Sequence, residues 1–334
     1  MNALPPWIDA QSKTLLSQQG HAWLLQGPSG LGQYTLATAL VGAWLCESNM
    51  AATQGACGQC GSCHALSVHT HADLFVLMPE TILLALGWPL GEKAQSEIDN
   101  KSRKPSKEIR IDAMRDAIEF CQRTNARGKG KAVLVFPAER MNHITANALL
   151  KTLEEPPGAL KFVLASEAAH QLLPTIRSRC LIHTMVWPDP QEATAWLQTQ
   201  GIAPAEAALL LKSAGGRPEV VQRQKLMGQS MQWWSSFPKA MRAGDASFCS
   251  DLPASEVISA LQKLCHDLLM AQIFAPLRYF DSKDLPAVKV STVQLTAWFK
   301  RLSLAAKSAE HPFNAGLMLE ALCADAFEVM NSGN

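Results

Sequence analysis

The chain has 334 residues, which is enough for two or three domains with separate hydrophobic cores. Its formal charge of +1 produces no overall attraction to nucleic acid or anionic lipid, so any contact with DNA would need a local basic patch. No apolar run approaches the length of a membrane span, and the first residues lack the basic and apolar regions of a secretion signal. We therefore expect a folded protein of the cytoplasm.

The first part of the chain alternates between strand-like and helix-like segments. This alternation predicts a parallel sheet that is covered by helices on both faces, and we assign residues 1–187 to such an α/β domain. The predicted strands are at 22–26, 74–78, 132–136, 161–165 and 181–186.

A glycine-rich loop follows the first predicted strand and precedes an apolar helix. Gly27, Gly30 and Gly32 fit the phosphate-binding loop G-x-x-x-x-G-K-[ST] in spacing and context. The lysine of that motif is replaced by Gln33, and the hydroxyl residue that would hold Mg²⁺ is replaced by Tyr34. Because phosphoryl transfer depends on these charges, the loop predicts a nucleotide-binding fold that has lost hydrolysis.

Four cysteines near this helix have the spacing of a metal site, which we place in a module at 46–63. Cys57, Cys60 and Cys63 stand at two-residue intervals, and Cys46 lies upstream of them. Four thiolates suit a tetrahedral, structural Zn²⁺, although a redox pair remains an alternative. In a further alternative, Cys46 is replaced as a ligand by a nearby histidine: His64, His69 or His71.

Two other segments of this domain are unusual. Residues 79–108 are first apolar and then charged, and we predict a partly mobile surface insertion rather than an overlooked helix. The third strand should end in acidic residues that hold Mg²⁺, but it ends in Phe136-Pro137. Glu139 lies two residues beyond the expected catalytic position. A misaligned strand is the alternative explanation.

After Trp187-Pro188 the sequence is helical throughout. We predict a small helical lid domain at 188–228 and a helical C-terminal collar domain at 229–334. The predicted helices are at 190–200, 203–213, from Pro218, 257–269, 293–308 and 317–330.

Two long strings carry a family resemblance. Asn147-Ala148-Leu149-Leu150-Lys151-Thr152-Leu153-Glu154-Glu155-Pro156-Pro157 and Leu173-Pro174-Thr175-Ile176-Arg177-Ser178-Arg179-Cys180 resemble the bacterial clamp-loader branch of the AAA+ ATPases. The altered phosphate loop and the cysteines add to this resemblance, which covers about 20–220. It implies an AAA+ α/β domain with an inserted zinc module, followed by the lid and an oligomerising collar.

The resemblance also implies roles for individual residues. Arg179 is the expected arginine finger, which reaches the γ-phosphate in a neighbouring subunit, because a guanidinium binds phosphate in a fork. Arg177 is its competitor and is expected to pair with Glu154 or Glu155. A small hydroxyl residue that senses the γ-phosphate is expected near Ser166.

By this resemblance the chain is a non-hydrolysing subunit of the bacterial DNA polymerase III holoenzyme, bound to structural Zn²⁺. Its implied partners are the ATPase (gamma/tau) and delta subunits, the sliding clamp, and primer–template DNA reached through the assembled complex. One alternative is a self-sufficient P-loop NTPase that uses Gln33 and Glu139. Another is a zinc-dependent DNA-binding protein, which is disfavoured because residues 46–71 contain no lysine or arginine.

Overall fold

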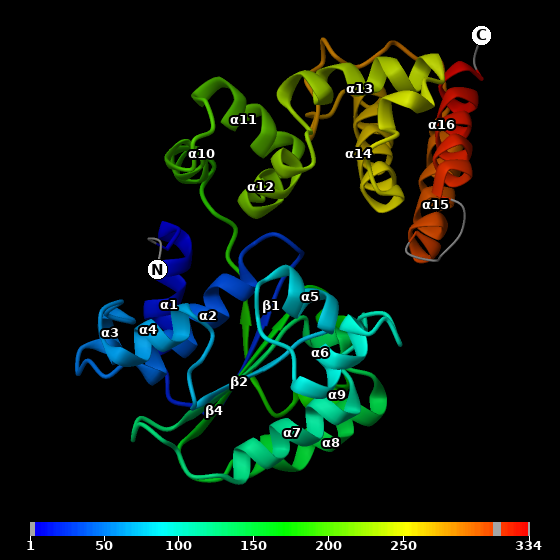
Figure 1. Cartoon of the computed structure of the whole chain (residues 1–334). Coiled ribbons are helices and arrows are strands. Elements are labelled where there is room, and N and C mark those ends of the chain that lie inside the picture. The colour runs from blue at the N-terminus through cyan, green and yellow to red at the C-terminus, as the bar shows by residue number, and fades with distance from the viewer. Residues whose placement is uncertain (1–3, 310–314, 333–334) are drawn as a thin grey trace. The chain divides into compact units, whose positions relative to one another are not determined.

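The computed structural model describes residues 4–309 and 315–332. Residues 1–3, 310–314 and 333–334 lie outside this description. Residues 1–3 belong to the predicted α/β domain, and the other two segments belong to the predicted collar domain. The chain divides into two compact units, Met1–Pro188 and Asp189–Asn334 (Figure 1). In the described part, no helix combines the length and the apolar character needed to cross a bilayer.

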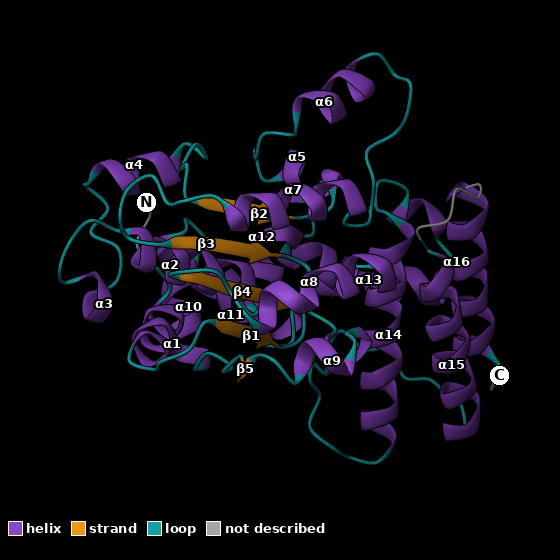
Figure 2. Ribbon diagram, turned by 90° about the horizontal axis from the view of Figure 1, so that it is seen from below, coloured by secondary structure: helices purple, strands orange, loops and turns teal. Residues whose placement is uncertain are grey.

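The first unit contains a five-stranded sheet in the order β2-β3-β4-β1-β5 (Figure 2). All neighbouring strands are parallel, which confirms the predicted α/β fold class. The strands are β1 (Ala22–Gln26), β2 (Leu74–Leu77), β3 (Lys131–Val135), β4 (Leu160–Ser166) and β5 (Leu181–Thr184).

Side chains alternate between the two faces of each strand, so each face has its own core. On β1, Leu24 packs in a cluster with Leu149 of α8 (His143–Glu154) and Met114 of α7 (Ile111–Gln122). The next residue towards the N-terminus, Trp23, meets the ring of Trp44 on α2 (Gln33–Leu45), with ring centroids 5.0 Å apart. Helices therefore cover both faces, with α2 on one and α7 and α8 on the other (Figure 1).

The remaining elements of this unit are short connectors and flanking helices. They are α1 (Pro6–Leu16), α3 (Ala51–Gln54), α4 (Gly61–Ser67), α5 (Glu80–Ala85), α6 (Glu92–Asp99), η1 (Ala138–Arg140), η2 (Ala169–Gln171) and α9 (Pro174–Arg177).

The insertion at 79–108 contains two of these helices, so the prediction that no helix had been overlooked there was wrong. Helix α5 begins directly after Pro79 and buries Glu80, while α6 buries none of its residues. The apolar side of α6 consists of Ala94 and Ile98, which are half-buried, and is too short to stand out in the sequence. The insertion nevertheless lies at the surface, as expected.

The regular elements of the second unit are all helices in the part that the structure describes, and residues 273–291 form a long loop between two of them. Asp189 caps its first helix by accepting a hydrogen bond from the backbone N–H of Gln191 at 2.8 Å, and its core includes the fully buried Trp234, Phe237 and Trp298. The elements are α10 (Pro190–Thr199), α11 (Pro204–Ser213), α12 (Pro218–Leu226), α13 (Met231–Ala243), η3 (Ala246–Cys249), α14 (Ala254–Gln272), α15 (Thr292–Ser308) and α16 (Ala315–Asn331).

One lysine is buried in this unit. Lys263 on α14 is only 7% exposed, and its Nζ lies 4.7 Å from the ring centroid of Trp234 and 5.9 Å from that of Tyr279. Burial, with a smaller contribution from the positive charge of Arg217, lowers the pKa of Lys263 to about 7. The protein therefore keeps a titratable amine inside an aromatic core.

Candidate nucleotide and metal sites

The glycine loop joins β1 to α2 with the backbone that its motif predicts. Gly30 and Gly32 have φ values of 86° and 95°, which lie in the left-handed region that favours glycine, and α2 begins immediately afterwards at Gln33. In phosphate-binding loops the first N–H groups of such a helix face the anion. The backbone of a phosphate site is therefore in place.

The side chain of Gln33 turns back into this loop. Its Nε2 donates hydrogen bonds to the carbonyl oxygens of Gly27 and Pro28, at 2.8 and 2.9 Å. The residue is only 2% exposed. The amide at the lysine position is thus bonded to the loop itself and carries no charge that could neutralise a phosphate.

Tyr34 is held by aromatic neighbours from other segments. Its hydroxyl oxygen accepts a hydrogen bond from Nε1 of Trp88 at 2.8 Å, and its ring lies 5.3 Å from that of Phe136. Trp88 is in turn stacked on His69, with centroids 3.8 Å apart. Burial raises the pKa of Tyr34 above its ordinary value. The residue at the Mg²⁺-ligand position is therefore a protonated phenol that bonds to the insertion.

Glu139, the acid two residues beyond the expected catalytic position, is also bonded to the protein. Its carboxylate accepts a hydrogen bond from the hydroxyl of Ser166 at 2.7 Å and one from the backbone N–H of Glu167 at 3.1 Å. Ser166 ends β4 and is fully buried. The acid and the expected γ-phosphate sensor thus bond to each other.

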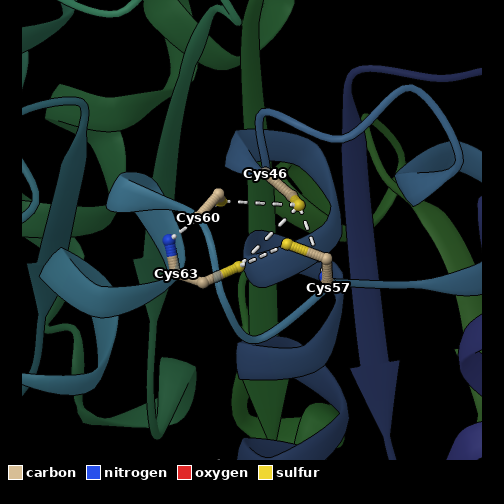
Figure 3. Close-up of side chains that lie close together, drawn as sticks. All are labelled: Cys46, Cys57, Cys60 and Cys63. Atoms are coloured by element: carbon tan, nitrogen blue, oxygen red, sulfur yellow. Dashed lines mark hydrogen bonds between the residues drawn. The ribbon is translucent and has the colours of Figure 1, made fainter.

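The four cysteines of the predicted metal module lie together (Figure 3). The Sγ atom of Cys46 is 3.8 Å from that of Cys60 and 3.7 Å from that of Cys63, and the Sγ atoms of Cys57 and Cys63 are 3.9 Å apart. Four sulfurs at about 2.3 Å from a central Zn²⁺ would be about 3.8 Å from one another in a tetrahedron. The cluster could therefore hold a metal ion of this size.

Backbone N–H groups favour the thiolate form of two of these cysteines, Cys57 and Cys60, whereas burial raises the pKa of the Cys63 thiol to about 12. The N–H groups of Gln59 and Cys60 lower the pKa of Cys57. Burial opposes ionisation of Cys60, but hydrogen bonds from the backbone of Glu47 and Cys63 outweigh it and lower its pKa to about 6. Glu47 also accepts hydrogen bonds from the backbone N–H and the hydroxyl of Ser62. The donor set and its surroundings fit a thiolate-bound metal.

The histidines considered as alternative ligands have other contacts or positions. His69 stacks on Trp88, and the Nδ1 atom of His71 accepts a hydrogen bond from the backbone N–H of Asp73 at 3.1 Å. His64 is exposed on α4. Among the described residues, the group that could hold a metal ion contains only the four cysteines.

Arg179 lies just beyond α9 and is partly exposed. Its Nε and Nη2 atoms contact Oε2 of Glu154 at 3.2 and 3.1 Å, and Nη1 donates to the carbonyl oxygen of Thr175 at 3.0 Å. We expected Arg177 to pair with Glu154 or Glu155, and this was wrong for Glu154. Glu154 ends α8, so the contact joins the two motif strings in space.

The strand order and the glycine loop define the class of this first unit as a phosphate-loop α/β domain of the AAA+ type. The profile of the family described as "DNA polymerase III, delta subunit" matches residues 9–187. The chain is 39% identical over 231 residues to DNA polymerase III subunit delta' of Pseudomonas aeruginosa, covering 68% of this chain and 62% of that protein. The corresponding protein of Escherichia coli is 33% identical over 221 residues, covering 64% and 58%.

A further relative is the tau subunit of DNA polymerase III of Salmonella typhimurium, at 33% identity over 161 residues, 48% of this chain and 21% of that protein. The chain belongs to the DNA polymerase III delta subunit family, and the relatives bear out the resemblance to its delta-prime branch. The chain spans about three fifths of the length of these delta' relatives.

Some contacts of the site were beyond the sequence analysis. The bond from Trp88 to Tyr34 joins residues 54 positions apart, and nothing in either local sequence indicates it. The hydrogen bonds from Gln33 to its own loop are only weakly indicated by the sequence: an uncharged amide, which can donate hydrogen bonds, stands where the motif has a charged lysine.

Proposed function

We propose that this chain is a non-hydrolysing, delta-prime-like component of a DNA polymerase III clamp-loader complex. In this role it completes a ring with the ATPase (gamma/tau) and delta subunits, and the ring opens the sliding clamp and closes it on primer–template DNA. The chain alone catalyses nothing. Such a replication role would place it with the bacterial chromosome in the cytoplasm.

One observation carries the proposal of a non-hydrolysing subunit: the polar groups of the nucleotide site bond to the protein itself. Gln33 bonds to its own loop, Tyr34 to Trp88, and Glu139 to the end of β4. A transferring phosphoryl group needs fixed positive charge and a metal, and these three residues offer neither. The self-sufficient NTPase is disfavoured for the same reason, because the two residues it would employ are Gln33 and Glu139.

Arg179 is proposed to act on a neighbouring subunit's nucleotide. Its present partner, Glu154, is 57% exposed, and exposed ion pairs contribute only about 0.2–1 kcal/mol. A γ-phosphate carries more negative charge than one carboxylate and accepts a forked guanidinium, so exchanging Glu154 for the phosphate costs little. The pair with Glu154 would then keep Arg179 oriented until the subunits assemble.

The other parts of the chain are proposed to support assembly. The cysteine cluster holds Zn²⁺ as a structural site, because four protein ligands leave no open position for catalysis. Residues 188–228 form the lid domain, and residues 229–334 form the collar that joins the ring. Exposed apolar side chains on α15 and α16, such as Leu304 and Leu317, are consistent with a contact there.

The test is to compare complexes reconstituted with wild-type chain and with Arg179→Ala. We expect unchanged assembly, slower clamp loading, and lower clamp-stimulated ATPase. The loss should be below the roughly 10³–10⁵-fold found for arginine fingers of small GTPases, because other sites in the ring keep their own fingers. Equal rates in both assays would refute the finger role, and steady ATP turnover by the isolated chain would refute the non-hydrolysing role.

A further inference from the structure

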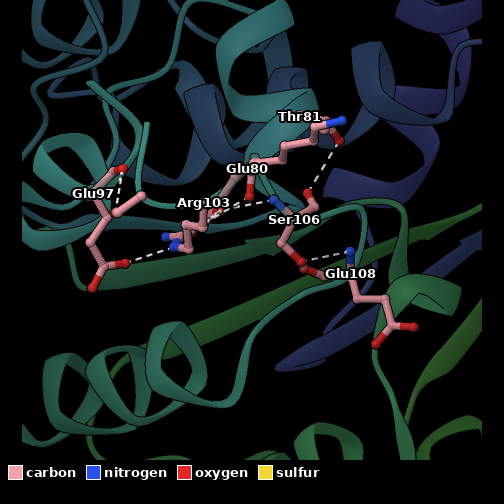
Figure 4. Close-up of polar contacts among 8 residues, drawn as sticks. Glu80, Thr81, Glu97, Arg103, Ser106 and Glu108 are labelled. Carbon is pink, nitrogen blue, oxygen red and sulfur yellow. Dashed lines mark hydrogen bonds and ion pairs between the residues drawn. The ribbon is translucent and has the colours of Figure 1, made fainter. Parts of the chain in front are cut away.

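Two charged side chains of the first unit show how this protein keeps a charge that is buried. Glu80 is 8% exposed and accepts the forked guanidinium of Arg103, with Nη1 to Oε2 at 2.5 Å and Nη2 to Oε1 at 2.7 Å (Figure 4). Lys131 is 7% exposed and donates hydrogen bonds to the carbonyl oxygens of Phe120 and Arg123. Both charges therefore receive polar partners in place of water.

Lys263 is buried to the same extent as Lys131 but lacks such partners. In the described part of the chain, its Nζ atom meets the ring faces of Trp234 and Tyr279, and no carbonyl oxygen or carboxylate accepts a hydrogen bond from it. An aromatic face attracts a cation but does not replace the hydrogen bonds that an ammonium group makes with water. Burial therefore favours the neutral amine, which keeps a lone pair on nitrogen and is a nucleophile.

Trp234 presents a second polar group without a partner beside this amine. The residue is 2% exposed, and its Nε1 meets no acceptor among the described residues. An indole N–H only donates, and a buried donor without an acceptor destabilises the folded state. The Nζ atom of Lys263 lies over the ring, whereas this N–H points outward from the ring edge. An acceptor oxygen two bonds beyond Nζ is therefore better placed for Trp234 than the amine itself.

The charges around Lys263 favour an anion over a cation. Besides burial, which is the main cause, Arg217 and Arg223 lower the pKa of Lys263, and Glu256 raises it. The Nε atom of Arg223 lies 3.6 Å from Oε1 of Glu256, so these two charges offset each other. Two arginines thus act on Nζ against one glutamate, and their combined field opposes a positive charge there and stabilises a negative one.

The loop after α14 completes this environment. Asp267, one turn beyond Lys263, is fully buried and accepts hydrogen bonds from the backbone N–H groups of residues 278–280 at 3.0, 2.8 and 2.8 Å. These bonds hold the ring of Tyr279 beside Nζ, and His266 packs edge-on against the same ring with centroids 5.3 Å apart. The guanidinium of Arg278 lies 5.5 Å from that ring. The acid nearest to Lys263 along α14 is therefore bonded to the loop rather than to the amine.

Carbon dioxide is the electrophile that fits these features. It is small and uncharged, so it can enter an apolar cage, and its adduct with an amine is an anion with two acceptor oxygens. An aldehyde would instead give an imine, which becomes a cation on protonation and carries no oxygen for Trp234. We propose that Lys263 reversibly binds carbon dioxide as a carbamate, with one oxygen accepting a hydrogen bond from Nε1 of Trp234. This inference goes beyond the proposed function and does not depend on it.

The reaction balances without any further reactant. The nitrogen lone pair of Lys263 attacks the carbon of carbon dioxide, a C–N bond forms, and one C=O electron pair moves onto oxygen. The nitrogen then releases one proton to water. A neutral amine and carbon dioxide thus become a carbamate anion and a proton, with no change in oxidation state.

Selectivity for Lys263 over other lysines follows from the fraction of neutral amine. At about pH 8, about nine tenths of an amine with a pKa of about 7 are neutral, against about 0.4% of an ordinary lysine with a pKa of about 10.4. Lys263 should therefore be favoured about 200-fold. At a fixed concentration of dissolved carbon dioxide, occupancy should rise as the pH rises through about 7, because only the neutral amine reacts.

The test uses the full chain with carbon-13-labelled bicarbonate at about pH 8 and follows the carbamate carbon by NMR. The α-amino group of the chain, whose ordinary pKa is about 8, also forms a carbamate and serves as an internal reference. Lys263→Met should lose one signal of the wild type and keep the reference. Triethyloxonium converts carbamates into stable ethoxycarbonyl adducts, and peptide mass spectrometry should find this adduct on Lys263 of the wild type, which requires no variant to fold.

Two tryptophan variants test the contact with the carbamate oxygen. Trp234→Phe keeps an aromatic ring but removes the N–H, so it should weaken carbon dioxide binding at least about tenfold through loss of a hydrogen bond to an anion. Trp298→Phe is the control, because its Nε1 is also buried without an acceptor but its ring is not one of the two over which Nζ lies. It should bind as the wild type does. Circular dichroism of each variant shows whether its fold is intact.

Thermal melting gives an independent readout. The melting temperature of the wild type should rise with dissolved carbon dioxide at fixed pH, because the folded state binds it far better than the unfolded chain. The same rise in Lys263→Met would indicate a bound anion and would overturn the proposal. So would the absence of an adduct on Lys263, or equal carbamate signals in wild type and Lys263→Met. Equal binding by Trp234→Phe and Trp298→Phe would refute the contact with Nε1.

Discussion

Replacing Lys263 with methionine should stabilise the second unit, and the gain should depend on pH. The perturbation keeps the length of the side chain over Trp234 and Tyr279 but removes the amine. An ordinary lysine has a pKa of about 10.4 in the unfolded chain, whereas burial lowers that of Lys263 to about 7 in the folded state. Between these two values the unfolded chain binds the proton and the folded chain does not, so wild-type stability rises with pH in this window.

The size of the effect follows from that difference in pKa. At about pH 6 both states are mostly protonated, and the buried charge costs the folded state almost 5 kcal/mol relative to high pH, taken as an upper limit. At about pH 9 this cost falls to about 2 kcal/mol. Arg217 and Arg223 add unfavourable charge around Lys263, and Glu256 offsets part of it. The advantage of Lys263→Met over wild type should therefore shrink by about 2–3 kcal/mol between these two pH values.

Urea unfolding at a series of pH values, fitted with separate transitions for the two units, measures this advantage. Lys283→Met, at an exposed lysine of the same unit, is the control and should show no such dependence. If the difference in free energy of unfolding between Lys263→Met and wild type stayed constant from about pH 6 to about pH 9, the lowered pKa of Lys263 in the folded state would be refuted.

Two further predictions concern the first unit. Cys60→Ser should reduce bound zinc from one ion per chain towards none and lower the melting temperature by several degrees. The control Cys121→Ser, at a buried cysteine outside the cluster, should keep its zinc. Full zinc occupancy in Cys60→Ser would contradict the four-cysteine site. Glu80→Gln should loosen the insertion, because Arg103 loses its buried ionic partner. Tryptic cleavage after Lys101 and Lys107, measured by mass spectrometry, should then be faster than in the wild type. Unchanged cleavage would mean that the pair of Glu80 and Arg103 does not anchor the insertion.

The sheet was predictable because its strands are nearly continuous apolar runs between turn signals. Strands such as β3 and β4 are buried on both faces, and this burial produces the pattern that the sequence displays. Helix α6 could not be predicted in the same way, because none of its residues is fully buried and its apolar side is only two residues long.

At the candidate site, the features that could be predicted are those whose residues lie close together in the sequence. The phosphate loop and the cysteine cluster lie within short segments, so their spacing nearly fixes their geometry. The partner of Glu154 depends instead on how α8 and α9 pack, and the sequence alone favoured Arg177 over Arg179. The contact from Trp88 to Tyr34 depends on the path of the whole insertion, which no local pattern encodes.

The inward-turned groups of the candidate nucleotide site also bear on whether the proposed loss of hydrolysis could be reversed. A lysine at position 33 would have to leave the carbonyls of Gly27 and Pro28, which Gln33 now satisfies. A small hydroxyl residue at 34 would leave the indole N–H of Trp88 without its acceptor, at a cost of about 1–3 kcal/mol if that group stays dry. Each of these substitutions alone would therefore destabilise the folded protein without restoring catalysis. The proposed loss of hydrolysis would therefore be hard to reverse, because several residues would have to change together before selection for ATP hydrolysis could act.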